Sequence, residues 1–182
     1  MTLIVRDAND SDMAAVHAIY SHHVGHGFGT FDEVPPPLSA YERKWREVVD
    51  AGLAWLVAVE ASEVVGFAYA SVFRPRTGYR YTVEDSVYVR DDRRGRRVGS
   101  ALLTPLIGRC EAAGARQVVA VIGDSRNAGS IALHAKAGFV HSGTMRAVGF
   151  KLGRWVDIVM MQKALNGGDT TVPPPPGAWR LP

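Results

Sequence analysis

A turn that carries glycines and arginines just before a helix is the feature of this sequence best suited to hold a charged ligand. It reads Arg94-Gly95-Arg96-Arg97-Val98-Gly99-Ser100, and it lies between the β-rich Val87-Tyr88-Val89 and the apolar Ala101-Leu102-Leu103. The first backbone N–H groups of a helix have no helical acceptor, and the helix dipole makes that end positive. These donors suit an anion such as a pyrophosphate, and flanking arginines add charge-assisted hydrogen bonds. The alternative is a solvated basic turn.

The turn differs from two common phosphate-binding loops. It lacks the Lys-Ser/Thr ending of a P-loop, and it lacks the three-glycine spacing of a dinucleotide-binding fingerprint. The turn alone therefore leaves the kind of phosphate ligand open.

The elements that must position this turn follow from the spacing of apolar residues. Helical spacing predicts helices after Asn9, from about 39 to 49, from about 98 to 113, and over 128–137. Ser39 and Glu42 have the spacing of a capping box for the second helix. Pro105 should kink the third helix or shift its start. β-rich runs predict strands at 3–6, 53–60, 64–72, 82–89, 117–123, 139–150 and 155–163.

The predicted order, β-α-α-β-β-β-α-β-α-β-β, indicates one α/β domain with a mixed sheet and helices on both faces. Only Ala61-Ser62-Glu63 separates the second and third strands, so they should form an antiparallel hairpin. The domain should cover residues 1–165. Residues 166–182 are rich in Gly, Pro and Thr without periodicity, which predicts a flexible Gly/Pro-rich tail.

Three longer blocks carry a resemblance to a known family. They read TVEDSVYV (82–89), VIGDSRNAGSIALHAKAGF (121–139) and VGFKLGRWVDIVMMQ (148–162). With the signature R-x-x-G-x-G/A that Arg94 and Gly99 match, the chain resembles the phosphinothricin and methionine sulfoximine N-acetyltransferases of the GNAT superfamily. The resemblance implies a GNAT-like, mostly antiparallel sheet and acetyl-CoA as the co-substrate, with no metal. It also implies acetylation of the α-amine of a small amino-acid analogue, such as L-phosphinothricin, methionine sulfoximine or methionine sulfone.

The resemblance assigns the turn to the pyrophosphate of acetyl-CoA, with one departure at its middle position. Glycine is usual there, whereas Arg97 has a Cβ and a long side chain. The amides can still point at a phosphate if the backbone of Arg97 keeps φ below zero. The strand at 82–89 should diverge from the strand at 117–123 and leave backbone groups free for the thioester and pantetheine. The implied cofactor-binding residues are Val87, Tyr88, Val89, Arg94, Gly95, Arg96, Arg97, Val98, Gly99, Ser100 and Asn127.

N-acetyl transfer needs a group that removes a proton from the amine. Only the free amine attacks a thioester, and an α-amine with a reference pKa of about 8 is mostly protonated at pH 7. Glu84 matches the glutamate to which the family assigns the role of base; the alternative is a solvated strand carboxylate. Asp85 should face the other side of the sheet, so both carboxylates cannot point into one pocket unless a bulge intervenes.

Three residues on predicted helices bear on the remaining steps. His134 stands where superfamily members often have a tyrosine that protonates the CoA thiolate. It is a candidate general acid, and the alternative is a residue that packs or contacts the cofactor, because a thiol with a pKa of about 8.5 does not strictly need an acid. Asn127 resembles the family's asparagine that contacts acetyl-CoA, and it also fits a helix N-cap. Cys110 has no adjacent base, which favours direct transfer over an acyl-cysteine.

The substrate side is indicated by the loop before the 82–89 strand, where Arg74 and Arg76 flank Pro75. This loop lines the amino-acid site in relatives, and a guanidinium suits a carboxylate or phosphinate. The alternative for each arginine is an ordinary exposed loop residue. With Glu84, Asp85 and Ser86 these three residues complete the expected substrate site. Phe31, Lys151, Arg154 and Trp155 are further candidates for its wall, although core or dimer packing fits Phe31 and Trp155 better.

Composition excludes several other classes of protein. The 182 residues are 47% hydrophobic and 21% charged, which is typical of one globular domain. One cysteine excludes an internal disulfide and a Cys-rich zinc site, and His22, His23 and His26 lack an obvious further metal ligand. The net charge of +3 is mild, and Asp91 and Asp92 interrupt the basic run, which argues against nucleic acid as a partner. No apolar run is long enough for a membrane span.

The sequence therefore predicts a cytoplasmic acetyl-CoA-dependent N-acetyltransferase, and the resemblance adds a homodimer. Two alternatives remain. The same fold could acetylate another amine, such as a different amino acid, a polyamine or a protein N-terminus. It could also be a CoA-binding regulatory domain without turnover, although Glu84 and the intact 82–89 block argue against this.

Overall fold

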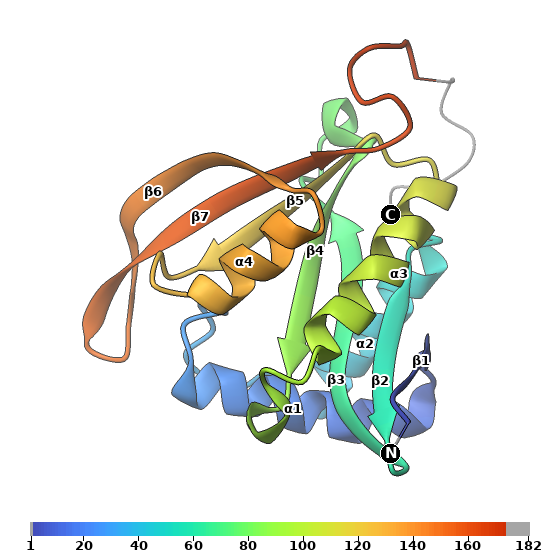
Figure 1. Cartoon of the computed structure of the whole chain (residues 1–182). Helices are drawn as coiled ribbons and strands as arrows, with labels where there is room; N and C mark the ends of the chain where they lie inside the picture. Colours follow the sequence, from blue (N-terminus) through green and yellow to red (C-terminus); the bar gives the residue numbers. More distant parts are fainter. Residues whose placement is uncertain (1, 174–182) are drawn as a thin grey trace.

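The apolar runs of the sequence assemble into one open sheet (Figure 1). A computed structural model describes residues 2–173, and within them the sheet has seven strands in the order β1-β2-β3-β4-β5-β7-β6. Every neighbouring pair is antiparallel except β4 and β5, which run parallel. The predicted mixed, mostly antiparallel single-domain sheet is thereby confirmed. The strands are β1 (Ile4–Asp7), β2 (Trp55–Glu60), β3 (Glu63–Val72), β4 (Thr82–Val89), β5 (Gln117–Gly123), β6 (Val140–Lys151) and β7 (Arg154–Ala164).

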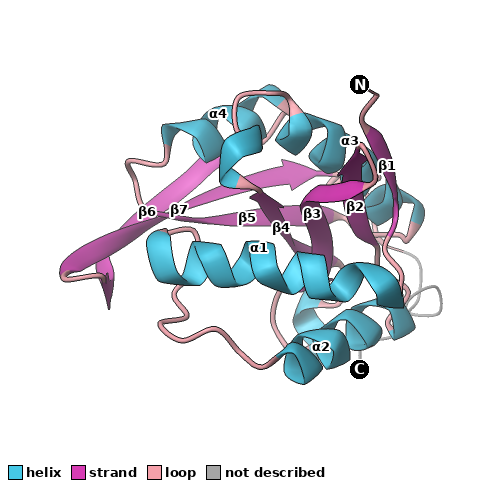
Figure 2. Cartoon of the chain, turned by 90° about the horizontal axis from the view of Figure 1, so that it is seen from below, coloured by secondary structure: helices cyan, strands magenta, loops and turns pink. Residues whose placement is uncertain are grey.

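Helices cover both faces of the sheet, as Figure 2 shows. One face carries α1 (Met13–His26) and α2 (Leu38–Asp50), and the other carries α3 (Val98–Ala112) and α4 (Ala128–Lys136). Strand side chains alternate between the two helix layers. Apolar residues from both layers are almost fully buried, among them Trp55 and Phe67 of the sheet and Leu102 of α3. The core therefore fixes all four helices against the strands that build the site.

One prediction about a helix boundary is wrong, and one of the two effects expected from Pro105 is absent. Ser39 does not cap α2: the helix begins at Leu38, and Pro37 takes the N-cap position without a side-chain hydrogen bond. Proline fixes φ near −65°, so the chain enters this helix from a preset extended conformation and needs no serine cap. Pro105 does not shift the start of α3, which runs from Val98 through Pro105 to Ala112.

The first part of the predicted tail is held by the domain. Arg116 donates through Nε to the carbonyl of Gly168 at 2.9 Å and through its terminal nitrogen to the carbonyl of Thr171 at 2.7 Å. Asn166 donates to the carbonyls of Glu111 and Ala115. Residues 166–171 thus form turns that are hydrogen-bonded to the domain. Residues 174–182 of that prediction lie outside the described residues.

Strands β4 and β5 diverge, as the resemblance implied. They pair only between Thr82–Asp85 and Gln117–Ala120, and beyond Asp85 the two strands separate (Figure 1). Residues 86–89 of β4 and 121–123 of β5 therefore have no partner strand on the edges that face each other. This opening connects the α1/α2 face of the sheet with the α3/α4 face.

Candidate active site

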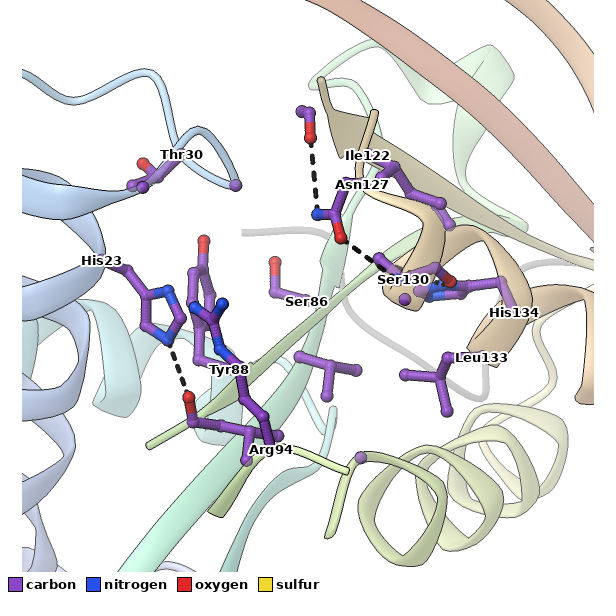
Figure 3. A pocket seen from close by; sticks show the side chains of 18 of the residues that line it. His23, Thr30, Ser86, Tyr88, Arg94, Ile122, Asn127, Ser130, Leu133 and His134 are labelled. Atoms are coloured by element: carbon purple, nitrogen blue, oxygen red, sulfur yellow. Dashed lines mark hydrogen bonds between the residues drawn. The ribbon is translucent and has the colours of Figure 1, made fainter. Parts of the chain in front are cut away.

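A cavity of about 1080 Å³ passes through the opening between β4 and β5. Its wall is formed by residues of β4, the turn before α3, the start of α4 and the loop after α1. Figure 3 shows Ser86 and Tyr88 of β4 between His23 of α1 and the Asn127 and His134 side chains at α4. Because the cavity reaches both faces of the sheet, two ligands can meet in it from opposite sides.

The turn before α3 presents free backbone donors to this cavity. The first helical hydrogen bond joins the N–H of Ala101 to the carbonyl of Arg97. The N–H groups of Val98, Gly99 and Ser100 have no acceptor among residues 2–173, and these three residues line the cavity. Free amides at the positive end of a 15-residue helix are suited to bind an anion, which is the role that the sequence predicts for this turn.

The backbone of Arg97 does not keep φ below zero. Its φ is +65° and its ψ is +9°, in the left-handed region, and it is the N-cap residue of α3. The chain makes the turn that a glycine would make, so the amides of the following residues still point toward the cavity. An L-residue pays for this conformation with about 1–2 kcal/mol of backbone strain.

The arginines around this turn differ in whether they are paired. Arg93 donates to Glu60 at 2.9 Å, and Arg94 pairs with Asp91 at 2.6 Å. Arg97 lines the cavity and has no carboxylate within 4.0 Å among the described residues. Arg96 does not line the cavity. Of the predicted cofactor-binding arginines, Arg97 is therefore the one whose charge is free to meet a phosphate.

The free edge of β4 is anchored from α1. The Nε2 of His23 donates to the carbonyl of Val89 at 2.9 Å, and burial lowers the pKa of His23, which favours its neutral form (Figure 3). Val87, Tyr88 and Val89 all line the cavity, as expected. The role of His23 as an anchor was not predicted, since a histidine on a helix gives no sequence signal for a contact with a distant strand.

Glu84 lies on β4 at the α1/α2 side of the cavity. Its carboxylate makes no hydrogen bond or ion pair with another described residue. Burial raises its pKa; the charges of Arg74 and Lys44 oppose the rise, and the charge of Asp85 adds to it. A half-buried, unpaired carboxylate with a raised pKa is suited to accept a proton near neutral pH.

Asp85 faces the opposite side, where it meets His134. The Nε2 of His134 lies 2.9 Å from Oδ2 of Asp85, and its Nδ1 lies 2.8 Å from the carbonyl of Ser130. Burial lowers the pKa of His134, but the carboxylate of Asp85 and the carbonyl of Ser130 outweigh it, so the net shift is upward. Both nitrogens of the imidazolium then donate within the protein. Glu84 and Asp85 nevertheless both line the cavity without a bulge in β4, because the cavity spans both faces.

Asn127 serves as the N-cap of α4. Its Oδ1 accepts from the N–H of Ser130 at 3.2 Å, and its Nδ2 points to the carbonyl of Gly123 at 3.5 Å (Figure 3). Asn127 also lines the cavity. The N-cap interpretation is confirmed, and the side chain remains positioned to meet a ligand.

The loop predicted to read the substrate lies outside the cavity. Arg74 is exposed, donates to the carbonyl of Phe73 at 2.9 Å and stacks over its ring, and neither Pro75 nor Arg76 lines the cavity. The charge of Arg74 still reaches Glu84. Ser86 does line the cavity, and its hydroxyl has no hydrogen-bond partner among the described residues.

The loop of residues 27–33 covers the α1/α2 side instead. Lys151 is 2% exposed and donates to the carbonyl of Thr30 at 2.7 Å, and Arg154 pairs with Asp124 and lies over the ring of Phe28. Phe31 lines the cavity, whereas Trp155 is exposed on β7. The sequence did not predict these contacts of the loop, because a loop rich in glycine shows no pattern that determines where it packs.

Known proteins match both the sequence and the fold. A profile of the acetyltransferase (GNAT) family matches residues 13–139. The chain belongs to this family. It is 50% identical over 169 residues to a phosphinothricin N-acetyltransferase of Alcaligenes faecalis, covering 93% of this chain and 86% of that one. It is 42% identical over 167 residues to an L-methionine sulfoximine/L-methionine sulfone acetyltransferase of Pseudomonas paraeruginosa, covering 91% and 96%.

A solved structure of a similar protein contains acetyl-CoA. It is a GNAT superfamily phosphinothricin acetyltransferase from Sinorhizobium meliloti in complex with acetyl-CoA. The TM-score is 0.93 at 42% identity, with 97% of this chain and 95% of that chain covered. The protein is thus an N-acetyltransferase that uses acetyl-CoA. Within residues 2–173, no helix is long and apolar enough to cross a membrane, and no cluster of three or more His, Cys, Asp or Glu could hold a metal.

Proposed function

We propose that this enzyme acetylates the α-amine of a small amino-acid analogue that ends in a tetrahedral polar group, such as L-phosphinothricin, methionine sulfoximine or methionine sulfone. One observation carries the proposal: the unpaired carboxylate of Glu84 lines the opening between β4 and β5, on the face opposite to Asp85 and α4. The names of the relatives at 50% and 42% identity support this substrate class.

The chain's residues divide the reaction between the two faces of the sheet. Acetyl-CoA binds with its pyrophosphate at the N–H groups of Val98–Ser100 and with its thioester along the free edge of β4. The amine enters from the α1/α2 face and gives its proton to Glu84, directly or through one water, a step that is worth about 10²–10⁴ in rate. The free amine then attacks the thioester carbonyl, and a backbone N–H of β4 stabilises the oxyanion. The intermediate then collapses: the CoA thiolate leaves, the nitrogen releases its second proton to the thiolate or to water, and no acyl-cysteine forms.

His134 enters this proposal as a fixed cation rather than as a free acid. Its two ring nitrogens are already hydrogen-bonded to the carboxylate of Asp85 and the carbonyl of Ser130. To protonate the thiolate, the ring would have to give up one of these buried hydrogen bonds. A CoA thiol with a reference pKa of about 8.5 does not require this, because its thiolate is already a good leaving group.

The proposal is tested by the release of CoA thiol with a panel of amines at equal concentration. Methionine sulfoximine or methionine sulfone should be acetylated at least ten-fold more efficiently than methionine, because methionine leaves donors of the site unpaired, at about 1–3 kcal/mol each. Phosphinothricin, spermidine and a peptide with a free N-terminus complete the panel. If spermidine or the peptide exceeds all the amino-acid analogues in kcat/KM, the proposed substrate class is wrong.

We further propose that the enzyme is a cytoplasmic homodimer whose interface includes the hairpin of β6 and β7. Several large apolar side chains of this hairpin are exposed, and an exposed apolar surface is a candidate for contact with another chain. Its exposed apolar residues are Val140, Met145, Val148, Phe150, Leu152 and Trp155. A second copy of the chain would remove these side chains from water.

The proposed location is the cytoplasm because acetyl-CoA is available there. The buried free thiol of Cys110 is compatible with this reducing compartment.

A further inference from the structure

A lysine without an acidic partner lies beside the proposed base. Lys44 of α2 is half-buried and lines the cavity, and its Nζ donates to the hydroxyl of Tyr69 at 2.7 Å. The ammonium also lies over the Tyr69 ring, 4.7 Å from its centroid. Among residues 2–173, no carboxylate lies within 4.0 Å of it. A partly desolvated charge usually has a counter-ion, so this arrangement leaves room for an anionic ligand.

Tyr69 extends this cation toward the cavity. It lines the cavity but is only 3% exposed, and its oxygen accepts the hydrogen bond from Lys44. The hydroxyl therefore keeps its own proton for another acceptor, and no described residue takes it. An ammonium and a hydroxyl side by side form a two-donor site of the kind that a carboxylate accepts.

The pair shares a face with Glu84. In the register of β3 and β4, Tyr69 lies opposite Ser86, and Ser71 lies opposite Glu84. Side chains opposite each other in an antiparallel pair point to the same face, and so do residues two apart. Glu84 and Tyr69 are thus diagonal neighbours. The charge of Lys44 reaches Glu84, where it opposes the rise in the pKa of the carboxyl.

Lys44 is also separated from the cations of the phosphate end. The other lysines and arginines that line the cavity come from the turn before α3 and from the α4 side: Arg93, Arg94, Arg97, Arg126 and Lys136. Among the described residues, Lys44 is the only lysine or arginine that lines the cavity on the α1/α2 side. If the amine of a zwitterionic amino acid lies at Glu84, its carboxylate lies near Lys44 and Tyr69.

We propose that Lys44 and Tyr69 bind the α-carboxylate of the amino-acid substrate, an inference that rests on the proposed function. The two ends of the zwitterion are then recognised by opposite charges on one face of the sheet. This geometry selects α-amino acids over simple amines, since an amine without a carboxylate leaves the ammonium of Lys44 without a counter-ion.

The test compares two substrates in steady-state kinetics: methionine sulfone and its carboxamide, which keeps the amine and the sulfone but lacks the charge. Lys44→Met should raise the KM for methionine sulfone by about ten- to 100-fold, the usual value of a hydrogen bond to a charged group. The KM for the carboxamide should change less than three-fold. Tyr69→Phe should give a smaller effect with the same selectivity, and it keeps the test open if Lys44→Met fails to fold.

One control variant accompanies this test, and three outcomes would overturn the proposal. Arg43→Met removes an exposed charge one residue away on α2, outside the cavity, and should alter neither KM. If Lys44→Met weakens both substrates equally and moves the acidic limb of the pH profile, Lys44 acts through Glu84 and the proposal is wrong. It is also wrong if Arg74→Met gives the acid-selective loss instead, or if Lys44→Met affects phosphinothricin but not methionine sulfone. If wild-type enzyme acetylates neither amino-acid substrate, the proposed function itself fails.

Discussion

Arg97 combines a cationic side chain with the backbone conformation of a glycine. Its φ of +65° directs the amides of Val98–Ser100 into the cavity, and its guanidinium has no carboxylate within 4.0 Å among the described residues. The residue that bears the strain of a left-handed conformation thus also places an unpaired charge beside the amides to which we assign the pyrophosphate. The sequence showed that glycine was missing here but could not show that the turn is kept.

Two substitutions at Arg97 separate strain from charge. Arg97→Ala and Arg97→Gly should both raise the KM for acetyl-CoA several-fold and leave the amine KM unchanged, with the effect shrinking at high salt. Only Arg97→Gly relieves the strain, so its free energy of unfolding should exceed that of Arg97→Ala by about 1 kcal/mol. Kinetics at two salt concentrations and urea unfolding measure both effects. An unchanged KM in both variants would mean that the side chain points to solvent.

Residue types with a strong chemical signature were the easiest to assign from the sequence. Glu84 lies on a strand next to a recognisable turn, and both features are local. Lys44 and His23 escaped prediction because their roles depend on contacts across 25 and 66 residues of chain, respectively. Arg76 was assigned to the site because this loop lines the amino-acid site in relatives, but nothing in the local sequence determines which way the loop faces in this chain.

At the scale of elements, the divergence of β4 and β5 creates the site, and the loop of residues 27–33 closes one side of it. This loop passes so near Gly123 at the end of β5 that a Cβ there would lie 1.9 Å from the carbonyl oxygen of Phe28. Backbone occupies the space of a side chain, so only glycine fits. The sequence predicted the strands well because their apolar runs are continuous, but a close approach between two loops leaves no periodic pattern.

Gly123→Ala should therefore push the loop away from the cavity. The expected result is a several-fold rise in the amine KM and a loss of about 1–3 kcal/mol in the free energy of unfolding, as for other overpacked sites. Gly143→Ala on β6 is the matched control, since a Cβ there meets nothing within 4 Å. Equal behaviour of the two variants in kinetics and urea unfolding would show that the loop position does not matter.

At the scale of the whole molecule, the order of elements and the location of the core could be predicted from the sequence. Apolar spacing and one strongly apolar hairpin are enough for that. The assembly state depends on which side chains are exposed together on the folded surface, and the spacing of apolar residues does not predict this. Phe150 and Trp155 lie on adjacent strands with their rings in edge contact, and they are 55% and 64% exposed.

The proposed dimer predicts that Trp155→Glu shifts the protein toward the monomer. A charge in the centre of an apolar interface is costly to bury. Light scattering coupled to size exclusion should then report about half the wild-type mass. Ile4→Glu is the control, because this isoleucine is 56% exposed and lies on β1, at the opposite edge of the sheet from β6. A wild-type protein that is already monomeric would disprove the proposed interface.

The central claim is that Glu84 removes the proton from the amine in the opening between β4 and β5. Its carboxylate must be ionised to act, and burial raises its pKa, so wild-type activity should rise with pH along an acidic limb above the ordinary glutamate range. In Glu84→Gln the base is absent, and the limb should move up to the pKa of the amine itself, about 8. Glu47→Gln, an exposed carboxylate on α2, should match the wild type.

The most direct measurement is therefore kcat against pH for wild type and Glu84→Gln with methionine sulfone. The account predicts that Glu84→Gln loses ten-fold or more in kcat at neutral pH and recovers much of it at high pH. Its affinity for acetyl-CoA should stay within a few-fold of that of the wild type. A Glu84→Gln enzyme with wild-type kcat across pH 6–8 would contradict the account.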